Sequence, residues 1–339
     1  MLARLFHAWE RRLYHATPNR VVRPFEWGLD WLPDEMRDDR LAPVEQVRAF
    51  AAAALADSDR FFEAPATADY EFSAADGHLR FPSALRTPHP ENNIVHARFF
   101  PARRPRRPSR AVLVLPQWNA DPEGHVALSR VLATFGIAAL RLSLPYHDRR
   151  MPPELHRADY IVSSNVVRTV QVCRQAVLDA RRAIAWLARQ GYERIGILGT
   201  SLGSCLAMLT TAHEPLVRAA ALNHVSPYFA DVVWEGLSTQ HVRAGLEGAI
   251  DLPTLRELWM PISPRAYLDR VRDTAVLLVY AKYDLTFPLG LSLQVVREFR
   301  ERAIPHRTSA LPCGHYTTGV GPFKWMDGFV LTRFLHEHL

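Results

Sequence analysis

The stretch RIGILGTSLGSCLAML, residues 194–209, joins two apolar runs through a short turn that contains Ser201. The first run is typical of a buried strand and the second of a helix. Glycines lie two residues before and two residues after the serine, at Gly199 and Gly203. In this G-x-S-x-G pattern a sharp turn holds a serine hydroxyl above the edge of a sheet, where it can act as a nucleophile. The alternative is a turn in which Ser201 only caps the helix.

Strands and helices alternate on both sides of this turn. Apolar runs bounded by glycine and proline predict strands, and amphipathic runs between them predict helices. Such alternation favours an α/β fold, with a mainly parallel sheet and helices on both faces. The predicted strands are 91–102, 110–118, 137–145, 194–199, 217–223, 274–284 and 306–312, and the predicted helices are 123–136, 165–190, 202–213, 289–302 and a closing helix from about 323.

The alternation is absent from two segments. Residues 1–65 are helical in pattern and interrupted by prolines, which indicates an N-terminal helical extension. Residues 224–270 are rich in aromatic side chains and predict a helical cap insertion over one end of the sheet. The core is then expected in two parts, 66–223 and 271–339, because 339 residues suit one large domain with an insertion.

An acid and a histidine follow the serine at the ends of later strands. Asp284 comes just after the apolar run of 274–284, and His315 lies in the loop after the next predicted strand. The carboxyl ends of parallel strands meet at one edge of a sheet, so Ser201, Asp284 and His315 are expected to lie together. In its serine turn GTSLG, its acid segment YAKYDLTFP and its GHY histidine, the chain resembles the α/β-hydrolase superfamily over roughly residues 70–339.

The resemblance implies a catalytic triad. Ser201 would attack an acyl carbon, His315 would take the proton, and Asp284 would fix the histidine tautomer. The backbone N–H of Leu202 would form one half of an oxyanion hole. Members of the superfamily typically carry His-Gly after the third strand, but this chain reads VLPQWNADPEGH at the end of the strand 110–118. Proline has no N–H, so the second donor is expected from Trp118, with Gln117 as the alternative.

Other residues compete for these roles. Asp231, inside the insertion, is the alternative acid, and His306 is expected on the far side of the sheet because it precedes the last strand. The loop after the strand 137–145 has two interpretations. It either contacts a polar group of the substrate or is a solvated loop that contains an Asp–Arg pair. The residues expected to line the substrate cavity are Tyr146, His147, His224, Tyr228, Trp234 and Trp259.

Composition limits the partners. The formal net charge is +6, but basic residues are dispersed apart from RRPRRPSR at 103–110, so nucleic-acid binding is not expected. The amphipathic N-terminal segment favours packing on its own core over contact with a membrane surface. Three isolated cysteines and the lack of a signal-like apolar segment favour a cytoplasmic location. No histidine or cysteine spacing suggests a metal site, so neither a metal nor a cofactor is expected.

These patterns predict a serine hydrolase that cleaves a carboxylic ester or related small acyl compound through an acyl-enzyme. An acyltransferase would use the same triad and pass the acyl group to another acceptor. A peptidase and a non-catalytic binding protein are further alternatives, and the oligomeric state stays open.

Overall fold

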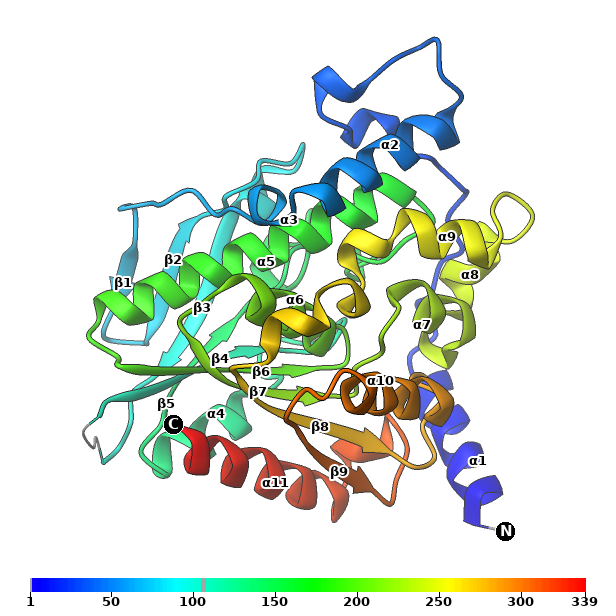
Figure 1. The fold of residues 1–339 in the computed structure, drawn as a ribbon. Coiled ribbons are helices and arrows are strands. Elements are labelled where there is room, and N and C mark those ends of the chain that lie inside the picture. The colour runs from blue at the N-terminus through cyan, green and yellow to red at the C-terminus, as the bar shows by residue number, and fades with distance from the viewer. Residues whose placement is uncertain (1, 105–107) are drawn as a thin grey trace.

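The computed structural model describes residues 2–104 and 108–339. Within these residues nine strands form one sheet, in the order β1-β2-β3-β5-β4-β6-β7-β8-β9 (Figure 1). The pairs from β5 to β9 are parallel, whereas β1, β2 and β3 pair antiparallel at the other edge. The strands are β1 (Glu71–Ser73), β2 (His78–Pro82), β3 (Ile94–Phe100), β4 (Arg110–Leu115), β5 (Ala138–Leu142), β6 (Arg194–Thr200), β7 (Val217–Asn223), β8 (Ala275–Ala281) and β9 (Arg307–Leu311).

The mainly parallel α/β fold expected from the sequence is therefore confirmed. Strands β1 and β2 were not predicted, since β1 is exposed throughout and β2 has only two buried residues, which alternate with more exposed ones. Residues 105–107, in the middle of the basic run 103–110, lie outside the described residues.

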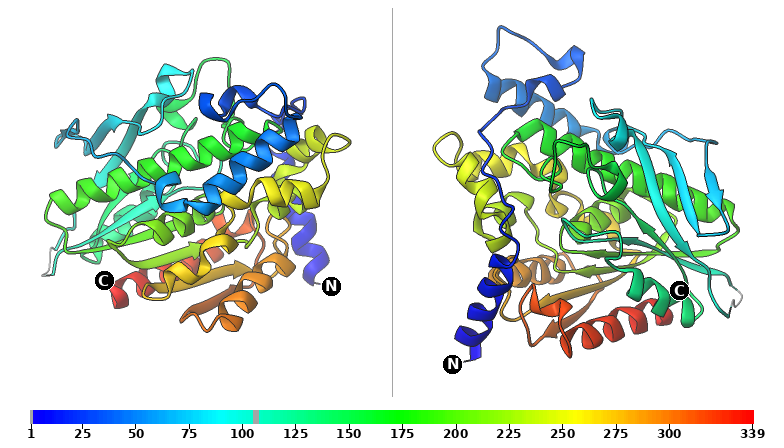
Figure 2. Two further views of the ribbon diagram at one scale, coloured as in Figure 1. Left: turned by 45° about the horizontal axis from the view of Figure 1, so that its top comes forward. Right: turned by 180° about the vertical axis from the view of Figure 1, so that it is seen from behind.

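Helices cover both faces of the sheet (Figures 1 and 2). Helices α5 (Val166–Arg189) and α6 (Leu202–His213) pack on one face, and α4 (Val126–Thr134) and α11 (Phe323–His338) pack on the other. Helices α2 (Pro43–Ala56) and α3 (Ser58–Phe61) lie outside α5, where Arg174 Nε of α5 donates to the Phe61 carbonyl (2.6 Å). Helix α10 (Leu289–Glu301) packs beside β8.

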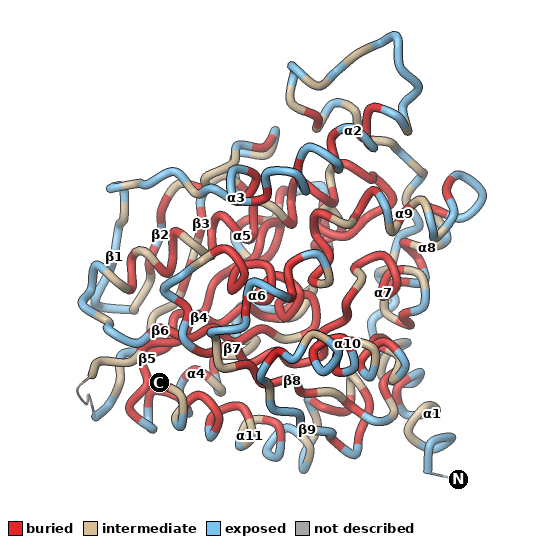
Figure 3. Tube along the Cα trace, viewed as in Figure 1, coloured by how far each residue is buried: buried red, intermediate tan, exposed pale blue. Residues whose placement is uncertain are grey.

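The core consists of two layers separated by the sheet. Leu113 of β4 belongs to the layer that includes α5 and α6, whereas its neighbours Val112 and Val114 belong to the layer that includes α11. All three side chains are fully buried, which explains why β4 is apolar at successive positions. The central strands are accordingly buried along their length in Figure 3.

The remaining helices gather beyond the carboxyl ends of the parallel strands. The insertion helices α7 (Phe229–Glu235), α8 (Gln240–Leu246) and α9 (Leu252–Leu258) lie there, and so does α1 (Leu2–His15) (Figures 1 and 2). Short 3₁₀ turns are η1 (Leu29–Trp31), η2 (Asp34–Met36), η3 (Pro90–Asn93), η4 (Asp148–Arg150), η5 (Leu237–Thr239), η6 (Met260–Ile262), η7 (Pro264–Val271) and η8 (Thr317–Gly319). Among the described residues, none of the helices is long and apolar enough to cross a membrane.

Candidate active site

Ser201 occupies a strained turn between β6 and α6. Its backbone has φ 57° and ψ −121°, a region that residues with a side chain rarely adopt. The turn is held by the Ser201 N–H, which donates to the carbonyl of Asn223 at the end of β7 (2.7 Å). A Cβ on Gly199 would lie 2.1 Å from the Gly203 carbonyl oxygen, and a Cβ on Gly203 would lie 2.3 Å from that of Leu115. Both glycines are therefore required by close backbone contact.

Asp284 and His315 form a hydrogen-bonded pair beside this turn. Asp284 Oδ1 accepts the backbone N–H groups of Thr286 and Phe287 (both 2.7 Å), and Oδ2 lies 3.0 Å from His315 Nδ1. The Phe287 ring stacks on the His315 ring at a centroid distance of 5.5 Å. Since Nδ1 donates to the carboxylate, Nε2 of the neutral ring is the nitrogen that carries no proton.

Charge and burial act in opposite directions on this pair. Burial alone would lower the pKa of His315, but the charge and hydrogen bond of Asp284, together with the charge of Glu10, raise it above its ordinary value. Burial alone would raise the pKa of Asp284, but the charge of His315 and its contacts with His224 and His315 hold it below its ordinary range. Asp284 is thus ionised and His315 is stabilised in its protonated form.

His224 is a second histidine on the same carboxylate. Its Nδ1 lies 3.1 Å from Asp284 Oδ2, without the alignment of a hydrogen bond, and its ring centroid lies 4.8 Å from that of His315. Burial lowers the pKa of His224 despite the neighbouring carboxylate, so this ring is neutral at neutral pH.

His224, Asp284 and His315 are also a donor set that fits a metal, because their ligand atoms lie within 4.8 Å of one another. However, the His315 nitrogen is at hydrogen-bond distance from the carboxylate, and the second carboxylate oxygen is occupied by two backbone N–H groups. The contacts therefore fit an acid that orients a histidine base better than they fit ligands of an ion.

The loop after β4 lies opposite the serine turn. Gln117, Trp118, Ser201 and Leu202 line the same cavity, and no backbone N–H of Gln117 or Trp118 is a donor among the hydrogen bonds of the described residues. The Trp118 indole N–H is fixed by the Ala158 carbonyl (2.8 Å). Within the described residues these two backbone N–H groups therefore have no intramolecular acceptor, as a role in an oxyanion hole would require.

His147 supports this loop instead of lining the cavity. Its Nε2 accepts the N–H of Asn119 (2.9 Å), a residue with φ 57°, and its Nδ1 lies 2.9 Å from the Pro145 carbonyl. The neighbouring Asp148 pairs with the buried Arg141 (2.5 Å). The expectation of a solvated Asp–Arg pair was therefore wrong for Asp148, whose partner is a buried arginine of β5, whereas Arg149 of the same loop is exposed.

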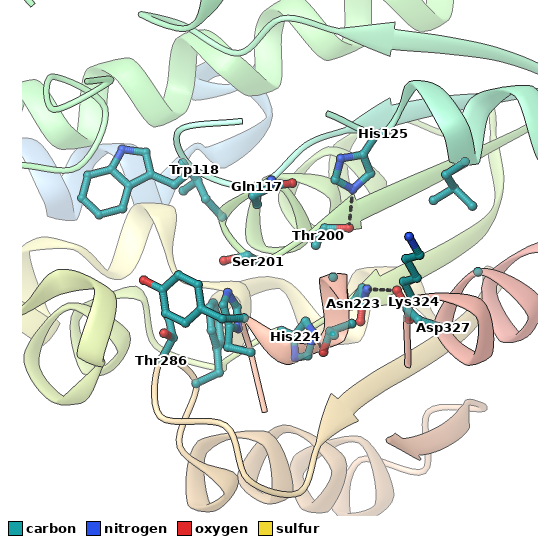
Figure 4. Close-up of a pocket in the computed structure, with 18 of the residues that line it drawn as sticks. Gln117, Trp118, His125, Thr200, Ser201, Asn223, His224, Thr286, Lys324 and Asp327 are labelled. Carbon is teal, nitrogen blue, oxygen red and sulfur yellow. Dashed lines mark hydrogen bonds between the residues drawn. The ribbon is translucent and has the colours of Figure 1, made fainter. Parts of the chain in front are cut away.

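The cavity has a volume of about 1060 Å³ and extends to both sides of Ser201 (Figure 4). One wall is apolar and comes from α7 and the loop after β8, with Phe229, Val232, Val233 and Phe287. Toward the other end lie α4 and α11, including Lys324 and Asp327. The N-terminal segment contributes Thr17 and Arg20.

Of the six residues expected to line the cavity, the structure places only His224 there within its described part. Trp259 is fully buried and its indole N–H donates to the Val166 carbonyl (3.1 Å), so it packs the insertion onto α5. Tyr146 is fully buried with its hydroxyl 3.0 Å from His89 Nδ1. The rings of Tyr228 and Trp234 instead face arginine guanidinium groups, those of Arg256 and Arg265 for Tyr228 and of Arg243 for Trp234.

The alternative acid Asp231 and the histidine His306 have partners outside the active site. Asp231 is 1% exposed and forms a two-point ion pair with Arg256 (2.5 and 3.0 Å), so its carboxylate is engaged within the insertion. His306 precedes β9, and its Nδ1 lies 2.8 Å from the Ile304 carbonyl. It is therefore at the amino end of a parallel strand, opposite the edge that carries Ser201.

A polar cluster lines the cavity at the carboxyl ends of β6 and β7. Asn223 Nδ2 donates to Asp327 Oδ2 (2.9 Å), and His125 Nε2 lies 2.9 Å from Thr200 Oγ1 (Figure 4). Asn223 Oδ1, Asp327 Oδ1 and His125 Nδ1 are buried without a hydrogen-bond partner in the described chain. Burial raises the pKa of Asp327 to about 7, so this carboxyl exchanges its proton near neutral pH.

The raised pKa of Asp327 leads us to expect that the stability of the folded protein depends on pH. Its pKa is about 7 when folded and 3.8 when exposed, so the folded state loses stability as pH rises from about 4 through about 7. The difference of about three units corresponds to about 4 kcal/mol at most. Asp327→Asn keeps an acceptor for Asn223 but does not titrate. The Tm of the variant minus the Tm of the wild type is expected to be several degrees larger at pH 8 than at pH 4. An equal difference in Tm at both pH values would contradict this.

The strained serine turn, the acid and histidine at later strand ends, and the parallel sheet define this protein as an α/β hydrolase. The chain belongs to the family described as "Alpha/beta hydrolase domain containing 18", whose model matches residues 73–242. No curated protein matches the chain in sequence.

Solved structures share the fold at low sequence identity. An acylaminoacyl peptidase from Pyrococcus horikoshii is 14% identical with a TM-score of 0.61; the match covers 80% of this chain but only 42% of the peptidase. Acetyl xylan esterase 1 from Thermoanaerobacterium sp. JW/SL YS485 is 13% identical with a TM-score of 0.59, over 96% of this chain and 98% of the esterase. A cold-adapted esterase from an Arctic intertidal metagenomic library is 13% identical with a TM-score of 0.52, over 80% of this chain and 98% of the esterase.

Proposed function

We propose that this protein is a serine hydrolase that cleaves carboxylic esters, or related small acyl compounds, through an acyl-enzyme. The observation that carries the proposal is the 3.0 Å contact between His315 and Asp284, in a cavity that also exposes Ser201 on its strained turn. A nucleophile, a base and an acid that orients the base are the three groups that acyl transfer to a serine requires.

The reaction has two halves. The Ser201 hydroxyl attacks the carbonyl carbon while His315 Nε2 takes its proton, and the N–H groups of Leu202 and of Trp118 or Gln117 bind the oxyanion. The C–O bond to the alcohol then breaks, and His315 returns the proton to the leaving oxygen. In the second half, His315 takes a proton from water as the water oxygen attacks the acyl-enzyme. The bond between the acyl carbon and Ser201 Oγ then breaks, His315 returns the proton to Oγ, and the acid leaves.

The apolar wall of α7 supports an apolar group on the substrate. Phe229, Val232 and Val233 present hydrocarbon surface to the cavity, and burial of such surface favours an acyl or alcohol group with few polar atoms. The structural relatives named above include esterases and a peptidase. At this low sequence identity the likeness shows only a shared fold, so the preferred leaving group is tested by assay.

Matched substrates test the ester preference. We expect the wild-type protein to turn over p-nitrophenyl butyrate with a higher kcat/KM than the p-nitroanilide of the same acid. We also expect free butyrate as the main product when an alcohol acceptor is added. An anilide rate equal to the ester rate would favour a peptidase, and transfer of most butyryl groups to the alcohol would favour an acyltransferase.

A further inference from the structure

The N-terminal helix α1 contacts the loop that carries His315. Glu10 of α1 is fully buried, and its carboxylate accepts three hydrogen bonds from this loop. Oε2 accepts the backbone N–H of Tyr316, while Oε1 accepts the backbone N–H and the hydroxyl of Thr317, all at 2.9 Å. These donors directly follow His315 in the chain, so the position of the carboxylate fixes the backbone on the carboxyl side of the histidine.

The backbone on the amino side of the histidine is shaped for the same contact. A Cβ at Gly314 would lie 2.4 Å from the Glu10 carboxyl carbon, so a larger residue here would displace the carboxylate from its present position. The Gly314 N–H donates to Thr317 Oγ1 (2.7 Å), which in turn donates to Glu10. The segment from Gly314 to Thr317 therefore folds around this one side chain.

Helix α1 also contacts the loop that carries Asp284. The Phe6 ring stacks on Tyr283, with a centroid distance of 4.7 Å and an interplanar angle of 9°. Tyr283 immediately precedes Asp284, and its N–H donates to the Cys313 carbonyl (2.9 Å). One turn of α1 separates Phe6 from Glu10, so a single helix face touches the loops of both residues of the pair.

We infer that Glu10 is a positioning residue of the active site, which holds the His315 loop and places a negative charge beside the base. The inference rests on the proposed function, in which His315 gains a proton as Ser201 attacks. A buried carboxylate is costly unless it is fully hydrogen-bonded, and here its partners are the backbone and hydroxyl donors of one catalytic loop. The N-terminal helix thereby helps to position the loop that carries the base.

The charges around His315 indicate the direction of the effect. Burial lowers the pKa of His315, whereas Asp284 and then Glu10 raise it. Other titratable groups near this site are His224 after β7, and Tyr316 with Arg20, whose guanidinium lies 3.3 Å from the Tyr316 hydroxyl. Cys313 is a further one, and burial, with smaller contributions from the charges of Glu10 and Asp284, raises the pKa of its thiol. Loss of the Glu10 charge is therefore expected to lower the pKa of His315.

Glu10→Gln tests the inference in the full-length protein. The amide keeps one acceptor, loses the charge, and turns an N–H toward a backbone N–H. We expect kcat for p-nitrophenyl butyrate to fall about 10-fold with little change in KM, because misplaced reacting groups lower the rate of the chemical step. The acidic limb of kcat/KM is expected to move to lower pH. Glu10→Ala removes all three bonds and is expected to lower kcat about 100-fold.

Glu26→Ala is the matched control. Glu26 is also a carboxylate of the N-terminal segment, and it accepts a hydrogen bond from Asn165 Nδ2 (2.7 Å) at the start of α5. Its loss removes a tether of this segment without touching either catalytic loop, so we expect an unchanged kcat. A fall in kcat equal to that of Glu10→Ala would reduce the role of Glu10 to general attachment of the segment and would overturn the inference.

An NMR titration of the His315 ring separates this inference from the proposed function. The His315 signals are assigned by their loss in His315→Gln, and the titration needs no turnover. A lower pKa of His315 in folded Glu10→Gln supports the inference even if the wild type hydrolyses no ester. The absence of ester hydrolysis would contradict only the proposed function. An unshifted pKa together with an unchanged kcat would overturn the role of Glu10.

Discussion

Ser201→Ala is expected to lower kcat for ester hydrolysis by about 10⁴- to 10⁶-fold while the protein stays folded. The variant removes the hydroxyl and leaves the turn, whose backbone is held by the hydrogen bond to the Asn223 carbonyl and by the close contacts of Gly199 and Gly203. Without the nucleophile no acyl-enzyme forms. The measurement is kcat for p-nitrophenyl butyrate, with circular dichroism to establish folding.

His315→Ala is expected to cost about as much as Ser201→Ala, and the double variant little more, because nucleophile and base act as a unit. Full additivity of the two losses on a logarithmic scale would mean that the residues act in separate steps, which contradicts the proposed mechanism.

Asp284→Asn is expected to lower kcat by about 10⁴-fold near neutral pH. The amide oxygen can still accept the N–H groups of Thr286 and Phe287, so the loop keeps its shape. The amide N–H group then faces His315 Nδ1 and favours the tautomer with the proton on Nε2, which cannot act as a base toward Ser201. Steady-state kinetics at pH 7, with circular dichroism for folding, measure the effect.

Asp231→Asn is the matched control for Asp284→Asn. Both carboxylates are buried, but Asp231 is paired with Arg256 inside the insertion. We expect a loss of less than about 10-fold in kcat, accompanied by a lower Tm because the buried Asp231 side chain loses its charged contact with the partly exposed Arg256. A larger loss of kcat in Asp231→Asn than in Asp284→Asn would assign the acid to the insertion.

The sheet and the ends of its strands were predictable from local pattern. Continuous apolar runs such as that of β4 occur because both faces of a central strand are covered, and Ser201 and Asp284 each follow such a run. His315 instead follows β9, a largely exposed edge strand. Strand β1 gave no such signal because it is exposed along its whole length.

Side-chain direction was not predictable in the same way. The insertion is rich in aromatics, but composition does not tell which face of a short helix turns to the cavity, and Trp259 packs against α5 while Phe229 lines the cavity. Glu10 had no local signal at all, since an acidic residue among arginines on an amphipathic helix is typical of a solvated face. Its partners Tyr316 and Thr317 lie more than 300 residues away in the sequence.

The most direct measurement of the central claim is the site of labelling by a fluorophosphonate, which reacts only with an activated serine. The account predicts one phosphonylated peptide in the wild-type digest, with mass-spectrometric fragments that place the adduct on Ser201, and no labelling of Ser201→Ala. An adduct on a different serine, or labelling of Ser201→Ala at the wild-type rate, would contradict Ser201 as the nucleophile.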